Sequence, residues 1–298
     1  MLRKRSYRCA SRTIAAPKIE RSSSDGSLRF AGTFVRQSSE AATTQTTAAT
    51  AKVATLQMRV AVISDVHANF HALAAVLEQI DAEGVEAIWC VGDVVGYGPQ
   101  PNECCEVVRE RCDLCLVGNH DLVALGQISV GDFNDEAAAA ATWTAGELNH
   151  ESRTFLEGLQ PTGTAEGVDL FHASARDPVW EYILTEEAAQ ATLDLTKAPV
   201  VLVGHSHVAL AITTVDSGVA GGLAPGGTDV QLDGRWLLNP GSVGQPRDGD
   251  PRAAWLLLDL DRMFAAFQRV PYSIEETQNE MRERGLPRML AARLARGE

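Results

Sequence analysis

The chain has 298 residues, of which 45% are hydrophobic, and a formal net charge of −13. A chain of this length and apolar content can bury a full core in one domain of upper-middle size. Its sequence holds no run of about 18 or more apolar residues, the length that a membrane-spanning helix needs. We therefore expect a cytoplasmic protein without a membrane span.

Charge divides the chain just before Met58. Residues 1–57 hold ten Lys or Arg and three Asp or Glu, a balance of +7, which leaves 16 basic and 36 acidic residues in 58–298, a balance of −20. A body this acidic cannot neutralise the phosphates of long nucleic acid or of an anionic membrane. We expect neither as a partner, and the missing basic groove also argues against a nuclease.

The first 57 residues are rich in Ser, Thr, Ala and Arg and show no sustained apolar period. This composition predicts a disordered extension, followed by one domain over 58–298. Two interpretations of the extension are open: a transit-like targeting segment, or a start assigned too early. We favour the second, because "MRVAVISD" begins a strand directly at Met58 and the segment lacks the apolar region of a signal peptide.

From Met58 onward, short apolar runs alternate with helical patterns. Residues 59–64 predict a strand, and apolar residues from Leu73 to Ile80 predict a helix capped by Asn69. Residues 86–91 predict a second strand, a helix follows Pro101, and residues 113–117 predict a third strand. Strand and helix in repeated alternation predict parallel strands with helices on the sheet faces.

The second half of the chain continues with helices and further strands. Residues 134–159 predict two Ala-rich helices that break near Gly146. Strands are expected at 168–173, 198–205, 235–244 and 253–260, a glycine-rich hairpin or loop at 214–234, and helices at 274–298. An apolar edge strand near 253–260 would give a homo-oligomer one route to form.

Six cysteines occur in the sequence, without an export signal, so we expect reduced thiols. Cys112 and Cys115 form a C-x-x-C pair, which also suggests zinc or redox chemistry. However, Cys115 lies in the apolar run "LCLV", and no second C-x-x-C pair follows. We therefore interpret the cysteines as buried structural thiols.

Side chains that can bind metals follow five of the predicted strands. They are Asp65 and His67 after the first, Asp93 after the second, Asn119 and His120 after the third, His172 at the end of the fourth, and His205 and His207 after the fifth. The carboxyl ends of parallel strands converge on one crevice, so these side chains are expected to meet. Each residue alone is equally compatible with a cap, a turn or a core position. Their joint occurrence favours a site, because only His71 and His150 among the seven histidines lie elsewhere.

The ordered motifs D-x-H at Asp65, G-D at Gly92, G-N-H-D at Gly118, a lone His172 and G-H-S-H at Gly204 resemble the calcineurin-like metallophosphoesterase superfamily. The segments "GDVVGYGPQPNE" and "NPGSVGQPRDGDPRA" are similar to its small bacterial and archaeal phosphodiesterase-like branch. The similarity extends over essentially everything from Met58 onward. Two departures are Ala68, where a Gly is usual, and the longer segment 214–234. The resemblance implies an α/β sandwich of two mixed β-sheets flanked by α-helices.

The resemblance also implies two divalent metal ions. Asp65, His67 and His207 would hold one ion, Asn119, His172 and His205 the other, and Asp93 would bridge both. Imidazole and carboxylate ligands without thiolate favour intermediate first-row ions, with Mn²⁺ expected first and Fe²⁺, Zn²⁺ or Ni²⁺ next, whereas Mg²⁺ prefers fewer histidines. Two dications and two carboxylates give the site a formal charge of about +2, which attracts a phosphate despite the acidic body.

In the implied mechanism, a hydroxide that bridges the metals attacks phosphorus in line, and no side-chain nucleophile is needed. His120 is the candidate general acid for the leaving group, with Asp121 expected to hold its ring and raise its pKa. The alternative role for His120 is to orient neighbouring ligands. Arg247 is expected either to hold a phosphate oxygen or to pair with Asp248 or Asp250, and Tyr97 either to contact substrate or to shape a Gly-Tyr-Gly-Pro turn.

The sequence therefore predicts a phosphodiesterase for a small, nucleotide-like ester. A phosphomonoesterase or protein phosphatase on the same metal centre is the alternative, because the fold does not choose between them. A non-catalytic scaffold of the same fold is a third hypothesis, but it predicts loss of ligands that this sequence retains.

Overall fold

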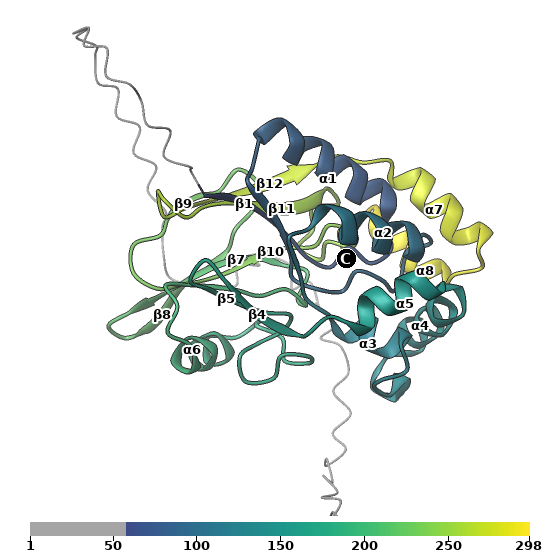
Figure 1. The fold of residues 1–298 in the computed structure, drawn as a ribbon, viewed down its shortest axis with the longest axis horizontal. Helices are drawn as coiled ribbons and strands as arrows, with labels where there is room; N and C mark the ends of the chain where they lie inside the picture. The colour runs from purple at the N-terminus through teal and green to yellow at the C-terminus, as the bar shows by residue number, and fades with distance from the viewer. Residues whose placement is uncertain (1–57) are drawn as a thin grey trace, which may run out of the picture.

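The computed structural model describes residues 58–298, so the extension predicted for residues 1–57 lies outside the described residues. Figure 1 shows two β-sheets in layers, with helices over their outer sides. In the described part, the strand order is β3-β2-β1-β11-β12-β9 in one six-stranded sheet and β4-β5-β6-β10-β7-β8 in the other. This architecture confirms the predicted sandwich of two mixed sheets flanked by helices.

The element bounds follow the predicted order closely. The first sheet contains β3 (Leu114–Cys115), β2 (Ala87–Cys90), β1 (Arg59–Ile63), β11 (Ala253–Asp259), β12 (Phe264–Val270) and β9 (Asp229–Gln231). The second contains β4 (Thr162–Ala165), β5 (Val168–Phe171), β6 (Val200–Leu202), β10 (Trp236–Pro240), β7 (Ala209–Val215) and β8 (Gly218–Leu223). The helices are α1 (Phe70–Glu83), α2 (Pro101–Arg111), α3 (Asn119–Ala124), the 3-10 helix η1 (Val130–Asp132), α4 (Asp135–Glu147), α5 (His150–Glu157), α6 (Glu186–Leu195), α7 (Ile274–Glu283) and α8 (Arg288–Leu294).

Parallel pairing, which the alternation of strands and helices predicts, occurs between β1 and β2, β2 and β3, β5 and β6, and β6 and β10. The strand at 253–260 differs from its prediction as an edge. It forms β11, which pairs with β1 on one side and β12 on the other, so both rows of its backbone groups are already used. A homo-oligomer cannot form by strand addition at β11.

Both faces of β1 are covered, which explains why its sequence is a continuous apolar run. Val60 and Val62 face the core between the sheets, where they meet Leu238 and Leu256. The alternate residues face the layer of α1 and α2. The second sheet is covered on its outer side by α6 (Figure 1).

Helix starts agree with the expected caps. The Asn69 side chain accepts a hydrogen bond from Ala72 N at 3.2 Å, and α2 begins at Pro101, where the missing N–H is no loss. The break between α4 and α5 falls at residues 148–149 and not at Gly146, which lies inside α4. The Asn149 side chain caps α5 by accepting from Ser152 N, and this local bond places the break.

The glycine-rich segment 214–234 does more than form one hairpin. It contains the turn from β7 to β8, and then crosses to the first sheet, where β9 pairs with β12. The C-terminal helices α7 and α8 pack with α4 around a separate apolar cluster that includes Tyr97, Met281 and Leu290. Segments from the two halves of the chain therefore meet around the loop that carries Tyr97.

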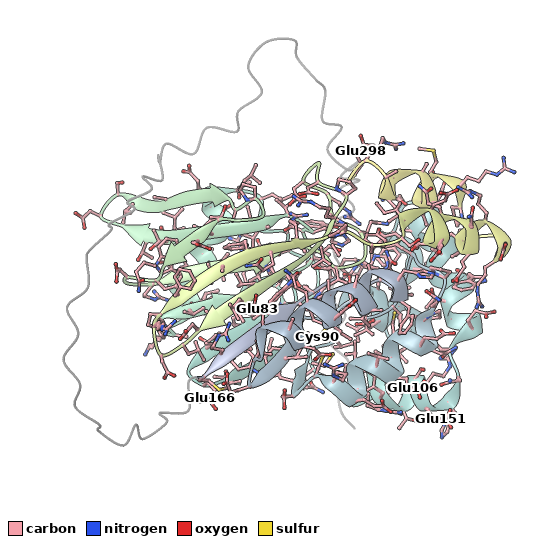
Figure 2. All side chains as sticks on the ribbon, turned by 90° about the horizontal axis from the view of Figure 1, so that it is seen from above. Glu83, Cys90, Glu106, Glu151, Glu166 and Glu298 are labelled. Carbon is pink, nitrogen blue, oxygen red and sulfur yellow. The ribbon has the colours of Figure 1, made fainter. Side chains whose placement is uncertain are left out.

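The cysteines within residues 58–298 are all free, and Cys90, Cys104 and Cys105 are buried. In Figure 2, Cys90 lies within the body of the protein, whereas Glu106 and Glu151 lie at its helical end. Burial raises the pKa of the Cys105 thiol above its usual range. Neither group of potential metal ligands found in the described residues includes a cysteine, which agrees with structural thiols.

The core between the sheets predicts a large difference between two leucine truncations. Leu238 is completely buried on β10, whereas Leu195, at the end of α6, is 63% exposed. We expect Leu238→Ala to lower the free energy of unfolding by about 2–5 kcal/mol and Leu195→Ala by less than about 0.5 kcal/mol. Urea titration of the metal-free variants measures both, and equal losses would contradict the assigned core.

Candidate metal centre

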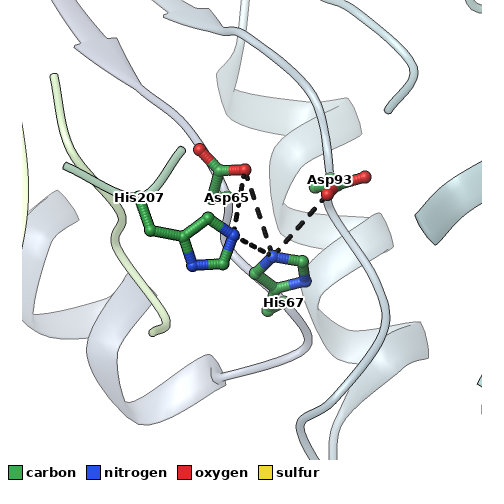
Figure 3. Close-up of side chains that lie close together, drawn as sticks. All are labelled: Asp65, His67, Asp93 and His207. Carbon is green, nitrogen blue, oxygen red and sulfur yellow. Dashed lines mark hydrogen bonds and ion pairs between the residues drawn. The ribbon is translucent and has the colours of Figure 1, made fainter. Parts of the chain in front are cut away.

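Two groups of buried side chains meet at the carboxyl ends of the parallel strands. Asp65, His67, Asp93 and His207 form the first group, with one potential ligand atom from each lying within 4.8 Å of the others (Figure 3). Asp93, His172 and His205 form the second under the same limit. The structure thus brings together the predicted residues in two groups that share Asp93.

The backbone at these positions adopts a conformation that sequence patterns do not reveal. Five of the seven predicted ligands have positive φ, in the left-handed region that non-glycine residues avoid at a cost of about 1–3 kcal/mol each. They are Asp65 at 53°, His67 at 48°, Asp93 at 52°, His205 at 63° and His207 at 58°. Loop hydrogen bonds hold the strained segments, including Asp65 N to Gly92 O and His67 N to Asp93 O, both at 3.0 Å.

The bridging candidate Asp93 depends on a glycine beside it. A Cβ at Gly118 would lie 2.0 Å from Asp93 Oδ1, so no larger residue fits at this position. Asp93 Oδ1 accepts the backbone N–H of His120 at 2.9 Å. Asp93 Oδ2 is buried and has no hydrogen-bond partner within the described residues. A buried, unpaired carboxylate oxygen is costly unless a cation reaches it.

The ring nitrogens of the first group show the same need for a cation. His67 Nδ1 lies 3.1 Å from Val95 O, and His207 Nδ1 lies 2.7 Å from Gln245 O. A carbonyl accepts only, so both Nδ1 atoms carry the proton and both Nε2 atoms keep a lone pair. These two Nε2 atoms are 2.9 Å apart. Two lone pairs at this distance repel, and a shared divalent ion relieves the repulsion.

The second group repeats this arrangement. His172 Nδ1 lies 2.9 Å from Val91 O, so its Nε2 presents a lone pair to Asn119 Oδ1 at 3.2 Å and to Asp93 Oδ2 at 3.5 Å. His205 uses the opposite nitrogen, because its Nε2 donates to Trp180 O at 3.2 Å and its Nδ1 is left free. The free ring nitrogens of His172 and His205, Asn119 Oδ1 and Asp93 Oδ2 are all acceptors, and a divalent ion between them would satisfy all four.

Burial sets the protonation of the cluster in the absence of metal. It lowers the pKa of His67, His205 and His207 well below the usual histidine range, with the Arg247 charge or the other imidazoles adding to the effect. Burial also raises the pKa of Asp65 to about 7. The imidazoles are therefore neutral ligands, and the Asp65 carboxyl must release a proton before it can bind a metal ion at neutral pH.

His120 lies beside the ligands, with its ring centroid 4.9 Å from that of His67, but it does not interact with Asp121 as expected. Asp121 Oδ1 accepts from Val95 N at 2.9 Å, and its Oδ2 accepts from Gly118 N at 2.9 Å and Val94 N at 3.3 Å. His120 Nδ1 is buried without a partner in the described chain. The prediction that Asp121 holds the His120 ring is therefore wrong, because the first turn of α3 directs the carboxylate to backbone N–H groups.

Aromatic rings hold His120 in place of a carboxylate. The ring centroid of Tyr97 lies 4.3 Å from that of His120, and the Phe133 centroid lies 4.4 Å away. A Cβ at Gly96 would lie 2.7 Å from His120 Nδ1, so this nitrogen is packed against the backbone. His120 Nε2 is the nitrogen left for chemistry.

Arg247 does not form the alternative ion pairs considered for it. Asp248 pairs with Arg269, and Asp250 pairs with Arg252 at 2.6 Å. Arg247 instead donates to Gln245 Oε1 at 2.8 Å and to the Tyr97 hydroxyl at 3.4 Å. Within residues 58–298, no carboxylate lies at ion-pair distance from this guanidinium. Burial raises the pKa of Asp65 and Asp93 and lowers that of His67; the charge of Arg247 opposes the effect of burial on the two carboxyls and adds to it on His67.

Sequence reasoning missed three aromatic residues near the site. Phe133 contacts His120, Trp180 lies edge-on to Phe133 with centroids 5.8 Å apart, and the Tyr182 ring stacks on His205 with centroids 4.0 Å apart. Two of them belong to the connection between β5 and α6, in the part after His172 that carries no motif. Their only signal was the aromatic spacing in "DPVWEYIL".

Two cavities differ in where they lie relative to the site. One of about 300 Å³ lies between α2 and α5, lined by Cys105, Glu106 and Glu151 among others, away from the histidines. The other has about 10 Å³, the size of one water, and lies beside His67 and Tyr97. Of the candidate ligands, His67 alone lines either of these two cavities.

Comparison with known proteins agrees with this fold. Residues 58–263 match the family described as the calcineurin-like phosphoesterase superfamily domain. The chain belongs to this superfamily, and it is a metal-dependent phosphoric ester hydrolase. No helix within residues 58–298 is long and apolar enough to cross a membrane.

Particular relatives come from bacteria and archaea. The crystal structure of a metallophosphoesterase from Sphaerobacter thermophilus is 42% identical, with a TM-score of 0.75, and the match covers 81% of this chain and 100% of that one. An uncharacterized protein from Methanocaldococcus jannaschii is 35% identical over 243 residues, 80% of this chain and 98% of that protein. A hypothetical protein from Pyrococcus horikoshii is 20% identical, with a TM-score of 0.66 over 80% of this chain and 98% of that one, and shows the same fold.

The raised pKa of Asp65 predicts how metal affinity depends on pH. Below its pKa of about 7 the carboxyl holds a proton that a metal ion must displace, and above it the carboxylate is free. The affinity for Mn²⁺ should therefore rise at least about tenfold between pH 6 and pH 8, with proton release.

Calorimetric titration in buffers of different ionisation enthalpy measures both the affinity and the protons released. Asp65→Asn should bind Mn²⁺ more weakly at every pH and with a flatter pH dependence. A wild-type affinity that does not change between pH 6 and pH 8 would contradict the assignment of Asp65 as a ligand.

Proposed function

We propose that this protein is a dinuclear metal-dependent phosphodiesterase acting on a small, nucleotide-like ester. The observation that carries the proposal is the position of His120. Its imidazole lies beside the two groups of candidate metal ligands that share Asp93. The similarity of residues 92–103 and 239–253 to the phosphodiesterase-like branch supports the choice of a diester.

The residues that would hold the metals are those of the two groups, with Asn119 Oδ1 added to the second. When bound, two divalent ions supply Lewis-acid activation of water and neutralisation of phosphate charge. The carboxylate, imidazole and amide donors suit intermediate first-row ions, of which we propose Mn²⁺. The carbonyls of Val91, Val95, Trp180 and Gln245 fix the four imidazole rings in the tautomers this requires.

His120 is the proposed general acid, acting through Nε2 on the departing oxygen. Burial and the neighbouring His67 lower the pKa of His120, and no carboxylate opposes this effect through a hydrogen bond. A bound phosphate anion would supply the opposing charge, so His120 gains its proton together with substrate. Asp121 contributes by fixing the loops around Asp93 and not by contacting the acid.

Arg247 and Tyr97 are the proposed substrate contacts. Arg247 is half-buried among neutral partners, so its guanidinium can donate to a phosphate oxygen. Tyr97 positions this group, since its hydroxyl accepts from Arg247 and its ring packs on His67 and His120.

One observation favours a phosphomonoesterase as the second candidate. Counting Arg247 with two dications and the two carboxylates gives the site a formal charge of about +3, which suits the dianion of a monoester better than the monoanion of a diester.

A homo-oligomer remains proposed without an assigned interface.

Site variants predict distinct losses of activity with a chromogenic phosphodiester and Mn²⁺. Asp93→Asn removes the shared ligand and should lower kcat/KM more than about 100-fold. His120→Asn should lower kcat about 10²–10⁴-fold for a poor leaving group such as a nucleoside, and much less for p-nitrophenolate, which departs without a proton. The matched control is His150→Asn, at an exposed position of α5.

The same assay with the matching monoester separates the two candidates. A higher kcat/KM for the diester supports the phosphodiesterase, and a higher value for the monoester supports the phosphomonoesterase. If His120→Asn lowers kcat equally for the nucleoside and the p-nitrophenolate leaving groups, the general-acid role is rejected.

A further inference from the structure

We infer that Tyr182 is a stacking platform for the nucleobase of the substrate, placed at the outer side of the metal centre. The inference rests on the proposed function, since it names the group attached to the scissile phosphate. It defines a subsite for a planar heteroaromatic ring bonded through a sugar to a phosphate ester.

Tyr182 differs from every other aromatic side chain in residues 58–298. It is 46% exposed, whereas each remaining Trp, Tyr and Phe of the described residues is buried or half-buried. Leaving a large ring in water forfeits the free energy of its burial. Its position beside a metal site marks it as a surface for a ligand more than as part of the core.

One face of the Tyr182 ring is already occupied. It lies against His205, with ring centroids 4.0 Å apart and planes inclined by 18°, a stacked arrangement. Burial raises the pKa of the Tyr182 hydroxyl, and the charge of Arg247, the proposed phosphate contact, opposes this effect. The face turned away from His205 is the one that a flat ligand can cover.

The exposed position of Tyr182 is held by its neighbours and does not reflect a loose segment. Next to it, Ile183 is 1% exposed in the core beneath α6. Two residues before it, Trp180 O accepts from His205 Nε2 at 3.2 Å. Glu181 accepts from Ser174 Oγ at 2.5 Å and pairs with Arg176. The ring is thus preorganised, which reduces the entropy lost on binding a ligand.

Stacking is the interaction that one tyrosine offers to a nucleobase, and it tolerates any base because each has a flat π-face. The acidic body excludes a long strand, so the fitting ligand is a single nucleoside phosphate unit. Its phosphate would reach the metal centre while its base covers Tyr182.

The experiment compares two ligands that share a phosphomonoester and differ in the base. Adenosine 5′-monophosphate and ribose 5-phosphate are titrated calorimetrically into the full-length protein loaded with Mn²⁺. Wild type should bind the nucleotide about 5–100-fold more tightly, the range expected for one stacked base. Tyr182→Ala should bring this ratio close to one while leaving the Kd of ribose 5-phosphate unchanged, and Tyr182→Phe should keep the wild-type ratio.

Leu184→Ala is the matched control, because Leu184 is 47% exposed on the same segment and should keep the wild-type ratio. Equal binding of both ligands to wild type would overturn the inference, as would an equal weakening of both in Tyr182→Ala, which would show an effect through His205. Because the titration compares the binding of two monoesters and does not measure diester hydrolysis, failure of diester hydrolysis would reject the proposed function separately.

Discussion

The structure depends on a repulsion that its own residues cannot relieve. Four imidazole rings use one nitrogen each to donate to a backbone carbonyl, and the remaining lone pairs converge on the two carboxylates and one amide oxygen. Burial keeps His67, His205 and His207 neutral, and the Asp65 carboxyl must release its proton when a metal ion binds. Divalent cations are the natural complement, and the strained loops around Asp65 and Asp93 are the means by which the fold keeps the acceptors together.

The aromatic surroundings give this centre its second property. His120 is placed by Tyr97 and Phe133, where Asp121 was expected, and His205 is covered by Tyr182. Rings fix an imidazole without adding negative charge, so among the candidate ligands only Asp65 and Asp93 would offset the charge of bound metals. Arg247 follows the same logic, since its partners are neutral.

The sequence predicted most of the fold and the grouping of the candidate ligands, because both follow from local patterns. Asp65, Asp93 and His172 stand where buried strands end, and parallel strands must end at one edge. Strand order could not be predicted: β11 reads as an apolar edge but lies between β1 and β12. The direction of Asp121 depends on the turn of α3, and Tyr182 reaches the site only because Ile183 is buried beneath α6.

The position of β11 has a consequence for how the protein is made. β1, which carries the chain into the first ligands, pairs on one side with β11 near the other end of the sequence. During synthesis β1 emerges early from the ribosome, whereas its second neighbour, β11, emerges only after most of the remaining sequence. The first sheet cannot close during synthesis of the N-terminal half, so the metal centre matures late and its apolar strands depend on protection until then.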